Sequence, residues 1–532
     1  MKEAATKNRL FLMIISLFFG AIGYAQPISL QAGRMKSSKR DGKTIQLLKD
    51  NVRFEQSGST VYCDEAEYDP STEDLVGRGN VRIINSEGTV VTGRNLFYNN
   101  ATHIARVDGN VKLKDGSLEL TTPWIQYHTQ TKLGWYNAGG TIIDKETKLV
   151  SRSGSYQPGL KTLYFRYQVV LSTPDYTVKT DTLQYRTDTK VASFYSATQI
   201  DYKNSALTFQ RGWYNTEKEV GKFYQQVGLF EPGKILICDT LEFDKKAETG
   251  LAHSHVYVID SANDLKGWGQ HCAYNGKTKF MSLWGAFSGN SGKALVWQTD
   301  ADNNPMKIIA DSLQYFNDSN AKIAFKAING VSLKQKGFAA TCKDLTSWRS
   351  DSCIRFSYHP VLWDSLTRIS GDSMELQLQN KKVRNLRVFN HAFTAMQENI
   401  AYYSQIAGDS MVNDFGDAQK IKEVRVYRNA KSIYYIKNDS NLIESANTVS
   451  GKNMKISMVD GKVETVKIYH EPKGIVYPID ALPVNEAKLP GFLWDPENMP
   501  TASQFVITDN YSIPILPYST KDGKNKKKGG RK

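Results

Sequence analysis

Few side chains in this 532-residue chain have a type and spacing that could do chemistry. His253 and His255 stand two residues apart. In a strand this spacing puts both imidazoles on one face, where they could begin a metal site. No third ligand follows at a spacing typical of zinc, so we expect both histidines to be structural.

Asp300-Ala-Asp-Asn-Asn304 begins like a calcium loop, but Pro305 replaces the required Gly and Asp311 the terminal Glu. The sequence has no Gly-x-Ser-x-Gly elbow and no Gly-rich phosphate loop. Carboxylate pairs such as Asp64 and Glu65 are too common to indicate a glycosidase. We therefore predict no catalytic residue, no metal and no cofactor, and hence a protein that is not an enzyme.

The N-terminus has the order of a secretory signal peptide. Lys2, Lys7 and Arg9 precede an apolar run from Leu10 to Ile22. Gly23 and Ala25 are the small residues expected before a cleavage at Gln26. The run is short for a membrane span, and no Cys follows the cut to carry a lipid. We expect a periplasmic mature chain, with association with the outer membrane left open.

The net charge of +14 is concentrated at the ends of the chain. The signal peptide contributes +2 and residues 521–532 contribute +6, which leaves +6 for the folded body. An exported protein rarely meets nucleic acid, so we expect no nucleic-acid partner. A mildly basic surface suits anionic lipid headgroups, although ordinary solubility explains it equally well.

A six-residue phrase recurs along the chain and predicts a repeat architecture. Its first position is small, its fourth is apolar and its sixth is aromatic. The copies begin at Cys63, Gly93, Thr122, Thr180, Cys238 and Ala310, with weaker copies ending at Tyr156 and Tyr214. From position 63 to 238 the starts are 29 or 30 residues apart, and later copies are spaced more widely. Periods of this size mean units that bury their apolar faces against their neighbours.

Each unit also contains a second strand, after a polar turn. Val81 and Ile83 alternate with Arg82, and Val111 and Leu113 alternate with Lys112. This period of two indicates strands with one buried face, and helical periodicity is absent from the mature chain. The predicted fold class is all-β, a stack of tandem strand repeats of roughly 30 residues.

The cysteines fit this repeat. Cys63, Cys238 and Cys342 occupy the small first position, and Cys272 an apolar fourth position, so we expect small core residues. Cys342 and Cys353 could also close a hairpin disulfide, which the sequence leaves open.

The phrase small-Asp-x-Leu-x-Tyr-Asp, a turn, and then Gly-Asn-Val resembles the OstA-like family. That family comprises the lipopolysaccharide-transport proteins LptA and LptC and the N-terminal domain of LptD. The closest matches are Asp64–Val81, Asp181–Asp188 and Asp239–Asp244. Gly371-Asp-Ser-Met, Gly408-Asp-Ser-Met and Gly451-Lys-Asn-Met resemble the long members of the Bacteroidetes type.

The resemblance implies an open β-jelly-roll whose apolar groove shields the acyl chains of lipid A. It also implies lipopolysaccharide as a partner, and edge-strand pairing with other OstA-like proteins or with a second copy of this chain. The fourth and sixth phrase positions share one face. The groove candidates are therefore Leu96, Tyr98, Ile125, Tyr127, Leu183, Tyr185, Leu241, Phe243, Leu313 and Tyr315. From the residues alone, a dry packed interior remains equally open.

The expected organisation has six parts. They are a signal peptide (1–25), a linker (26–48), two β-repeat modules (49–260 and 261–480), an irregular closing segment (481–520) and a basic disordered tail (521–532). The expected function is lipopolysaccharide binding and transport that bridges toward the outer membrane. The alternatives are a non-enzymatic envelope scaffold or adhesin and, less favoured, a β-helix polysaccharide-degrading enzyme.

Overall fold

A computed structural model describes residues 29–513, apart from positions 57, 87, 288–291, 300–303, 317–321, 349–351, 380–381, 417–419, 439, 441, 460–461, 509–510 and 512. The predicted signal peptide, most of the calcium-like sequence and the predicted basic tail lie outside the described residues. Within them, 38 strands and six short 3-10 helices are found, and no α-helix. The all-β prediction is confirmed.

The chain divides into two compact units. The first comprises Met1–Pro232, Thr240–Lys246 and Ile513–Lys532, and the second comprises Gly233–Asp239 and Ala247–Ser512.

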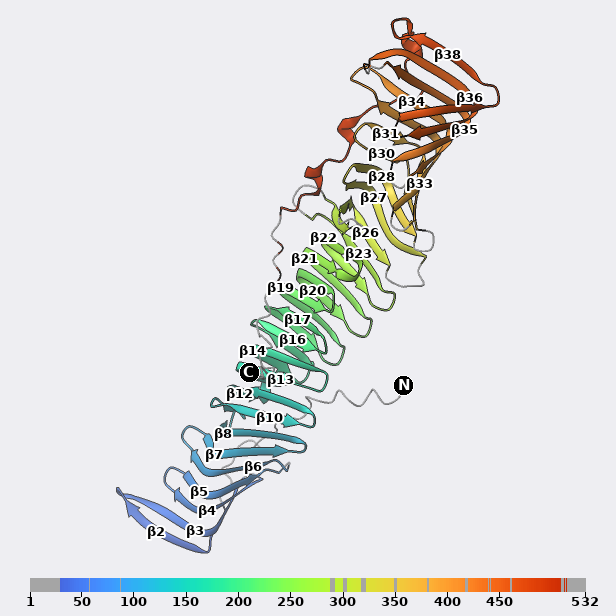
Figure 1. The fold of residues 1–532 in the computed structure, drawn as a ribbon. Coiled ribbons are helices and arrows are strands. Elements are labelled where there is room, and N and C mark those ends of the chain that lie inside the picture. Colours follow the sequence, from blue (N-terminus) through green and yellow to red (C-terminus); the bar gives the residue numbers. More distant parts are fainter. Residues whose placement is uncertain are drawn as a thin grey trace, which may run out of the picture. The chain divides into compact units, whose positions relative to one another are not determined.

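In the first unit, successive strands form antiparallel hairpins that lie side by side in chain order (Figure 1). They are β1 (Ser29–Gln31), β2 (Arg34–Arg40), β3 (Lys43–Gln56), β4 (Ser59–Asp69), β5 (Asp74–Ile84), β6 (Val90–Asn99), β7 (Ile104–Asp115), β8 (Leu118–His128), β9 (Gly134–Tyr136), β10 (Gly140–Asp144), β11 (Thr147–Ser151), β12 (Ser153–Gln157), β13 (Thr162–Ser172), β14 (Tyr176–Arg186), β15 (Val191–Phe194), β16 (Thr198–Tyr202), β17 (Ser205–Phe209), β18 (Arg211–Asn215) and β19 (Val220–Glu231), with the 3-10 helix η2 (Pro158–Leu160).

Strand β20 (Lys234–Asp244) crosses the division, and the second unit continues the same hairpin pattern. Its strands are β21 (Thr249–Asp260), β22 (Leu265–Asn275), β23 (Phe280–Trp284), β24 (Ala294–Thr299), β25 (Pro305–Ala310), β26 (Ser312–Phe316), β27 (Ile323–Gln335), β28 (Phe338–Trp348), β29 (Cys353–Ser357), β30 (Val361–Trp363), β31 (Thr367–Ser370), β32 (Ser373–Gln379), β33 (Lys382–Gln397), β34 (Tyr403–Phe415), β35 (Ile421–Lys437), β36 (Ile443–Val459), β37 (Lys462–Tyr469) and β38 (Lys473–Pro478). The 3-10 helices are η3 (Ser261–Asn263), η4 (Ile479–Ala481), η5 (Val484–Glu486), η6 (Pro496–Asn498) and η7 (Ala502–Phe505).

Each long hairpin bends at a corner that divides it between two layers. In the hairpin of β4 and β5, the pairing runs from Asp69 to Glu65, breaks, and resumes at Tyr62. We call the half that carries the aromatic phrase position layer A, and the other half layer B. The break on β5 is Gly79-Asn80, and both residues have left-handed backbone angles (φ 76° and 44°). The Gly-Asn of the repeat is therefore the corner.

The Asp of the repeat phrase stabilises the next corner. Asn80 Nδ2 donates to Asp64 Oδ2 at 2.9 Å, and Asn429 Nδ2 donates to Asp409 Oδ1 at 2.9 Å. A left-handed residue other than Gly costs roughly 1–2 kcal/mol, and a short polar side chain that hydrogen-bonds locally offsets part of that cost.

The small first position of the phrase is a steric requirement. A Cβ on Gly371 would lie 2.4 Å from Val388 Cγ1, and one on Gly408 would lie 2.3 Å from Val426 Cγ1. Both distances are far below van der Waals contact, because the next strand presents a branched side chain at this point. The small first position of the phrase thus meets a packing constraint, and the Asp that follows it forms a hydrogen bond to the Asn of the corner.

Several expectations from the sequence are wrong in detail. Residues 26–48, expected as a linker, contain β1, β2 and the first part of β3, all paired antiparallel. Strand β2 is exposed along most of its length, so it lacks the apolar alternation by which a strand is recognised. The sequence left a disulfide between Cys342 and Cys353 open; in the structure both are thiols, and Cys353 pairs across its hairpin with Trp348.

The closing segment of the second unit packs on its sheet. We call residues 479–508 with Tyr511 the strap; it has no strand among its described residues. Phe505 is fully buried against a cluster that includes Trp268 and Leu295 on layer B. Gln405 exchanges two hydrogen bonds with the strap backbone, at 3.0 and 2.8 Å. The strap is therefore an integral part of the second unit.

Candidate functional site: an apolar cavity in the first unit

A cavity lies between layers A and B of the first unit. Its volume is about 740 Å³, counted with the open space at its mouth. The lining residues are uncharged and mostly apolar, and come from β5 to β13: Ile83, Val91, Ala105, Val107, Leu113, Leu118, Leu120, Ile125, Tyr127, Gly134, Trp135, Tyr136, Ile142, Gly154, Ser155, Tyr156, Leu163 and Phe165.

The alternation of the strands aims these side chains inward. On β8, Leu118 and Leu120 are buried in layer B, and Ile125 and Tyr127 are buried in layer A. On β7, Leu113 is buried and its neighbours Lys112 and Lys114 are exposed. The face assigned from the sequence to Val81, Ile83, Val111 and Leu113 is confirmed, since all four are at most 4% exposed.

Tyr136 forms one wall of the cavity. Its ring lies against Gly140 and Gly154, where an added Cβ would come within 2.4–2.5 Å of ring carbons. Its hydroxyl is hydrogen-bonded to Ser151 Oγ at 2.8 Å. Burial raises the pKa of Tyr136 to about 12, so the hydroxyl stays neutral at physiological pH. Two glycines therefore make room for a neutral ring beside the open space.

The ten groove candidates divide into three groups. Ile125 and Tyr127 line the cavity. Leu96, Leu183, Tyr185, Leu241 and Leu313 are buried by packing, each at most 4% exposed. Tyr98 and Tyr315 are half-buried, and Phe243 is 37% exposed. The sixth phrase position is therefore not uniformly buried, since it holds Tyr185 as well as Phe243.

Most cavity residues were missed because they stand outside the phrase. Leu118, Leu120 and Phe165 could have been found by extending the alternation of their strands. Tyr136 and Gly154 could not, because β9 and β12 are too short to show a period of two.

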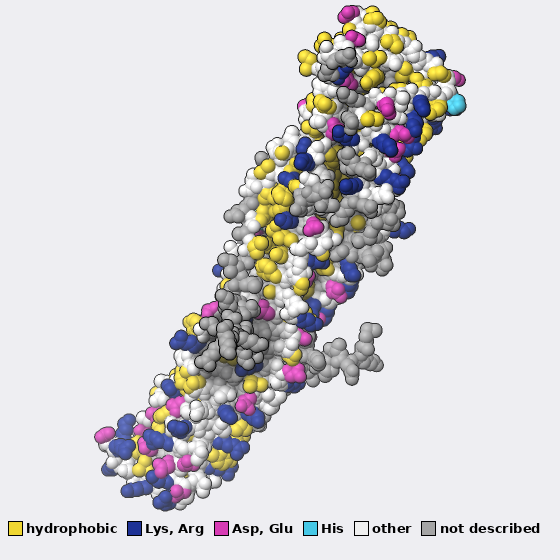
Figure 2. All heavy atoms as spheres, in the orientation of Figure 1, with side chains coloured by type: hydrophobic (Ala, Val, Ile, Leu, Met, Phe, Trp, Pro, Cys, Tyr) yellow, Lys and Arg dark blue, Asp and Glu magenta, His cyan; other side chains and the backbone are white. Residues whose placement is uncertain are grey.

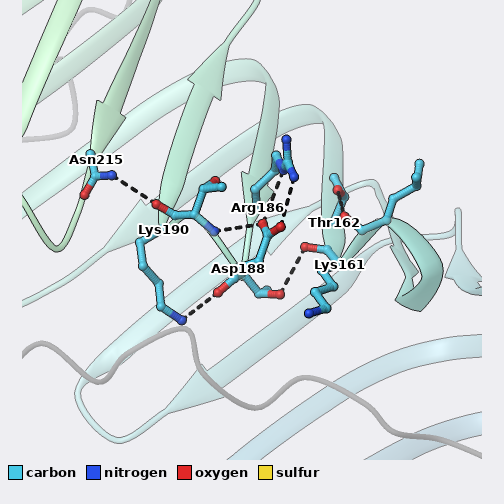
Figure 3. Close-up of polar contacts among 9 residues, drawn as sticks. Lys161, Thr162, Arg186, Asp188, Lys190 and Asn215 are labelled. Atoms are coloured by element: carbon cyan, nitrogen blue, oxygen red, sulfur yellow. Dashed lines mark hydrogen bonds and ion pairs between the residues drawn. The ribbon is translucent and has the colours of Figure 1, made fainter.

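The turns of layer A form one rim of the cavity mouth. In the first unit the last residue of each of these turns is left-handed: Glu73, His103, Lys132, Lys161, Lys190 and Glu219. Neighbouring turns are hydrogen-bonded to one another. Thr187 N and Oγ1 both donate to the Lys161 carbonyl (2.9 and 3.0 Å), and Asn215 Nδ2 donates to the Thr189 carbonyl at 3.0 Å (Figure 3). These bonds hold the rim as a regular row.

The histidines do not form a metal site. His253 and His255 do not share a face, as the sequence suggested, because the corner at Ser254-His255 separates them. His253 Nδ1 lies 2.9 Å from His271 Nδ1, and His255 Nδ1 lies 2.7 Å from Asp239 Oδ2. Among the described residues, no group of three His, Cys, Asp or Glu could hold a metal ion.

Four cysteines are buried core residues. Cys63, Cys238, Cys272 and Cys342 are each at most 9% exposed. Burial raises the pKa of the Cys63 thiol to about 11 and that of Cys272 to about 12, so neither is a thiolate at neutral pH.

A match to a family model supports the resemblance. The family model described as OstA-like protein matches residues 28–181, a stretch that contains the whole cavity. Among solved structures, the chain is similar to LptH of Pseudomonas aeruginosa, described as the LptA-homologous periplasmic component of the lipopolysaccharide transport device. The identity is 14%, the match covers 19% of this chain and 77% of that one, and the TM-score is 0.18. No curated protein matches. Within the described part, no helix is long and apolar enough to cross a membrane.

Proposed function

We propose that this chain, an OstA-like protein over residues 28–181, is a periplasmic carrier that binds lipopolysaccharide and shields its acyl chains from water. The observation that carries the proposal is the apolar cavity between the layers of that same stretch. Transfer of one twelve-carbon chain from water into such a space is worth roughly 10 kcal/mol, at about 0.8 kcal/mol per CH₂.

The carrier role requires neither catalysis nor a cofactor, and we propose that the protein has neither. The cavity lining offers no titratable group other than tyrosines. A site of this kind can hold and release an apolar chain.

Its terminal strands support a bridging role with similar proteins. Strands β37 and β38 both pair with β36, and Ile475 and Val476 on β38 are more than half exposed. Hydrophobic side chains gather at this end of the second unit, whereas Lys, Arg, Asp and Glu are dense over β2 and β3 (Figure 2). Open sheet edges are sites where a further strand can add.

The direct test is lipid retention by the mature protein. Protein purified from the periplasm without detergent is extracted, and the extract is analysed by mass spectrometry for lipid A. We expect co-purified glycolipid. Protein that carries none, and that does not bind added lipopolysaccharide, would contradict the carrier and favour the envelope scaffold.

A matched pair of variants locates the binding site. Ala105 lines the cavity and pairs with Tyr98 and Tyr127, whereas Ala192 has the same register between Tyr185 and Tyr214 but does not line it. Ala105→Trp should fill the cavity and abolish acyl-chain binding. Ala192→Trp should leave binding unchanged in protein that remains folded by circular dichroism. Equal binding by both variants would place the site elsewhere.

A further inference from the structure

The lining of the cavity reaches two rows of turns of unlike charge. Tyr127 and Gly134 flank one turn of layer A, and Tyr156 and Leu163 flank the next, so the cavity lining reaches this row. Leu118, which follows a turn of layer B, shows that the lining also reaches the opposite row.

The layer A row is cationic at the β8–β9 and β12–β13 turns, which the cavity lining reaches. These two turns end in Lys132 and Lys161, and the next turn along the row, beyond the lining, ends in Lys190; all three lysines are in the left-handed conformation (φ 59°, 49° and 60°). Lys161 is exposed and the other two are half-buried. Arg186 and Asp188 in the third turn form an ion pair with each other at 2.9 Å. We call the three lysines the cationic lip.

The spacing of the lip is fixed by the sheet. Successive layer A turns are two strands apart, so neighbouring lysines stand about 10 Å from each other along the row. The hydrogen bonds between turns hold the row, and Lys190 Nζ also donates to the Thr187 carbonyl at 2.6 Å (Figure 3). That bond occupies one of the three donors of the ammonium group and leaves two for a ligand.

The layer B row opposite is acidic. Its turns beside the cavity carry Asp115, Asp144, Glu146 and Asp175, with Lys145 among them. Ser117 Oγ donates to Asp144 Oδ1 at 2.6 Å and so links two of these turns. The hydroxyl of Thr187 links two turns of the layer A row in the same way. An anion at the mouth is therefore attracted to one side and repelled from the other.

We propose that the cationic lip binds the phosphate of an amphiphile whose acyl chain lies in the cavity. The inference rests on the proposed function and adds the headgroup class and its position. A phosphate monoester carries up to two negative charges and three acceptor oxygens, which suits neighbouring ammonium groups. The acidic row makes the orientation one-sided, because a phosphate there would meet carboxylates.

The test compares two probes that differ only in the phosphate. Binding of 1-lauroyl-glycerol and of 1-lauroyl-glycerol-3-phosphate is measured by displacement of a fluorescent fatty acid at low and at high salt. Wild type should prefer the phosphate ester on the order of 10- to 100-fold at low ionic strength, and the preference should shrink at high salt.

Two triple variants make the comparison specific. Lys132→Gln, Lys161→Gln and Lys190→Gln together should remove the preference without weakening the neutral probe. As the control, Gln replaces Lys112, Lys114 and Lys148, which are exposed on strands β7 and β11 of the same unit. The control removes the same net charge, so it should keep the preference.

The possible outcomes distinguish a failure of the phosphate-binding inference from a failure of the carrier function. If wild type binds both probes equally, or if the control loses the preference as fully as the lip variant, the inference is overturned and the apolar site stands. If neither probe binds, the carrier function itself fails. Lipid A with both phosphates, compared with its monophosphorylated form, then tests whether the phosphate that binds is that of the glycolipid.

Discussion

Removal of the carboxylate of Asp495 should detach the strap and destabilise the second unit. Asp495 Oδ1 lies 2.5 Å from Arg368 Nε, and the two side chains are only 12% and 6% exposed. Arg368 also donates from Nη1 to Ser370 Oγ at 2.9 Å. The charge on Arg368 is thus compensated chiefly by a residue of the strap, 127 positions away in sequence.

The size of the effect follows from the asymmetry of buried ion pairs. Asp495→Leu leaves a buried guanidinium without its counter-ion, which costs about 3–5 kcal/mol. The second unit has roughly 270 residues, and unfolding entropy near 2.1 cal/mol/K per residue converts this cost into a Tm decrease of about 5–9 °C. Replacing both partners, Arg368→Met with Asp495→Leu, should recover most of the loss, because no charge then stays buried.

Differential scanning calorimetry measures the Tm values, and limited proteolysis near Lys488 reports whether the strap is released. The exposed pair Arg186–Asp188 is the control, since solvent screens it and Asp188→Leu should leave the Tm nearly unchanged. The reasoning is refuted if Asp495→Leu shifts the transition by no more than Asp188→Leu does. It is equally refuted if the double variant is as unstable as Asp495→Leu alone.

Three further predictions follow from the repeat and its buried groups. Gly408→Cys should destabilise by about 1–3 kcal/mol in urea titrations, because its Cβ would meet Val426, and Val426→Ala in addition should restore part of the loss. At pH 8, Cys63 and Cys272 should resist alkylation until the chain unfolds, because burial raises their pKa to about 11 and 12 and leaves on the order of 0.1% thiolate or less. Burial, together with the charge of His253, lowers the pKa of His271 in the folded protein, so the unfolded state binds more protons than the folded state as the pH falls. The free energy of unfolding should therefore decrease as the pH decreases through about 6.5. His271→Gln should reduce this dependence of stability on pH in urea titrations, and an unchanged dependence would contradict the prediction.

The strand content and inward faces could be predicted because they depend on local alternation. Val111 and Leu113 alternate with lysine, and that pattern is sufficient to assign a buried face in a sheet of any topology. The small first position was also visible, although its cause was not. Only the structure shows that Val388 and Val426 of the following strands occupy the space a side chain would need at Gly371 and Gly408.

The wrong predictions concern residues at the corners of the hairpins and at the edge of the sheet. Two left-handed residues interrupt the period of two, so the faces of His253 and His255 could not be inferred by counting across Ser254-His255. Strand β2 is paired through its backbone on one side and exposes most of its side chains, and its sequence therefore resembles a linker. Backbone pairing leaves little trace in the identity of such side chains.

The cavity lies where three glycines between β8 and β13 leave inward positions without a side chain. At other inward positions of the first unit, such as Leu183 and Tyr185, side chains fill the space. At Gly134, Gly140 and Gly154 there is no side chain, and the ring of Tyr136 occupies only part of the room they leave. A glycine at an inward strand position weakens the sheet, and such glycines often mark a place where a ligand or another group approaches closely. The same stretch carries Lys132 and Lys161 on its turns, so the apolar space and the positive charge lie in the same repeats. This coincidence is our main reason to regard the cavity as a binding site for an anionic amphiphile and not as a packing defect.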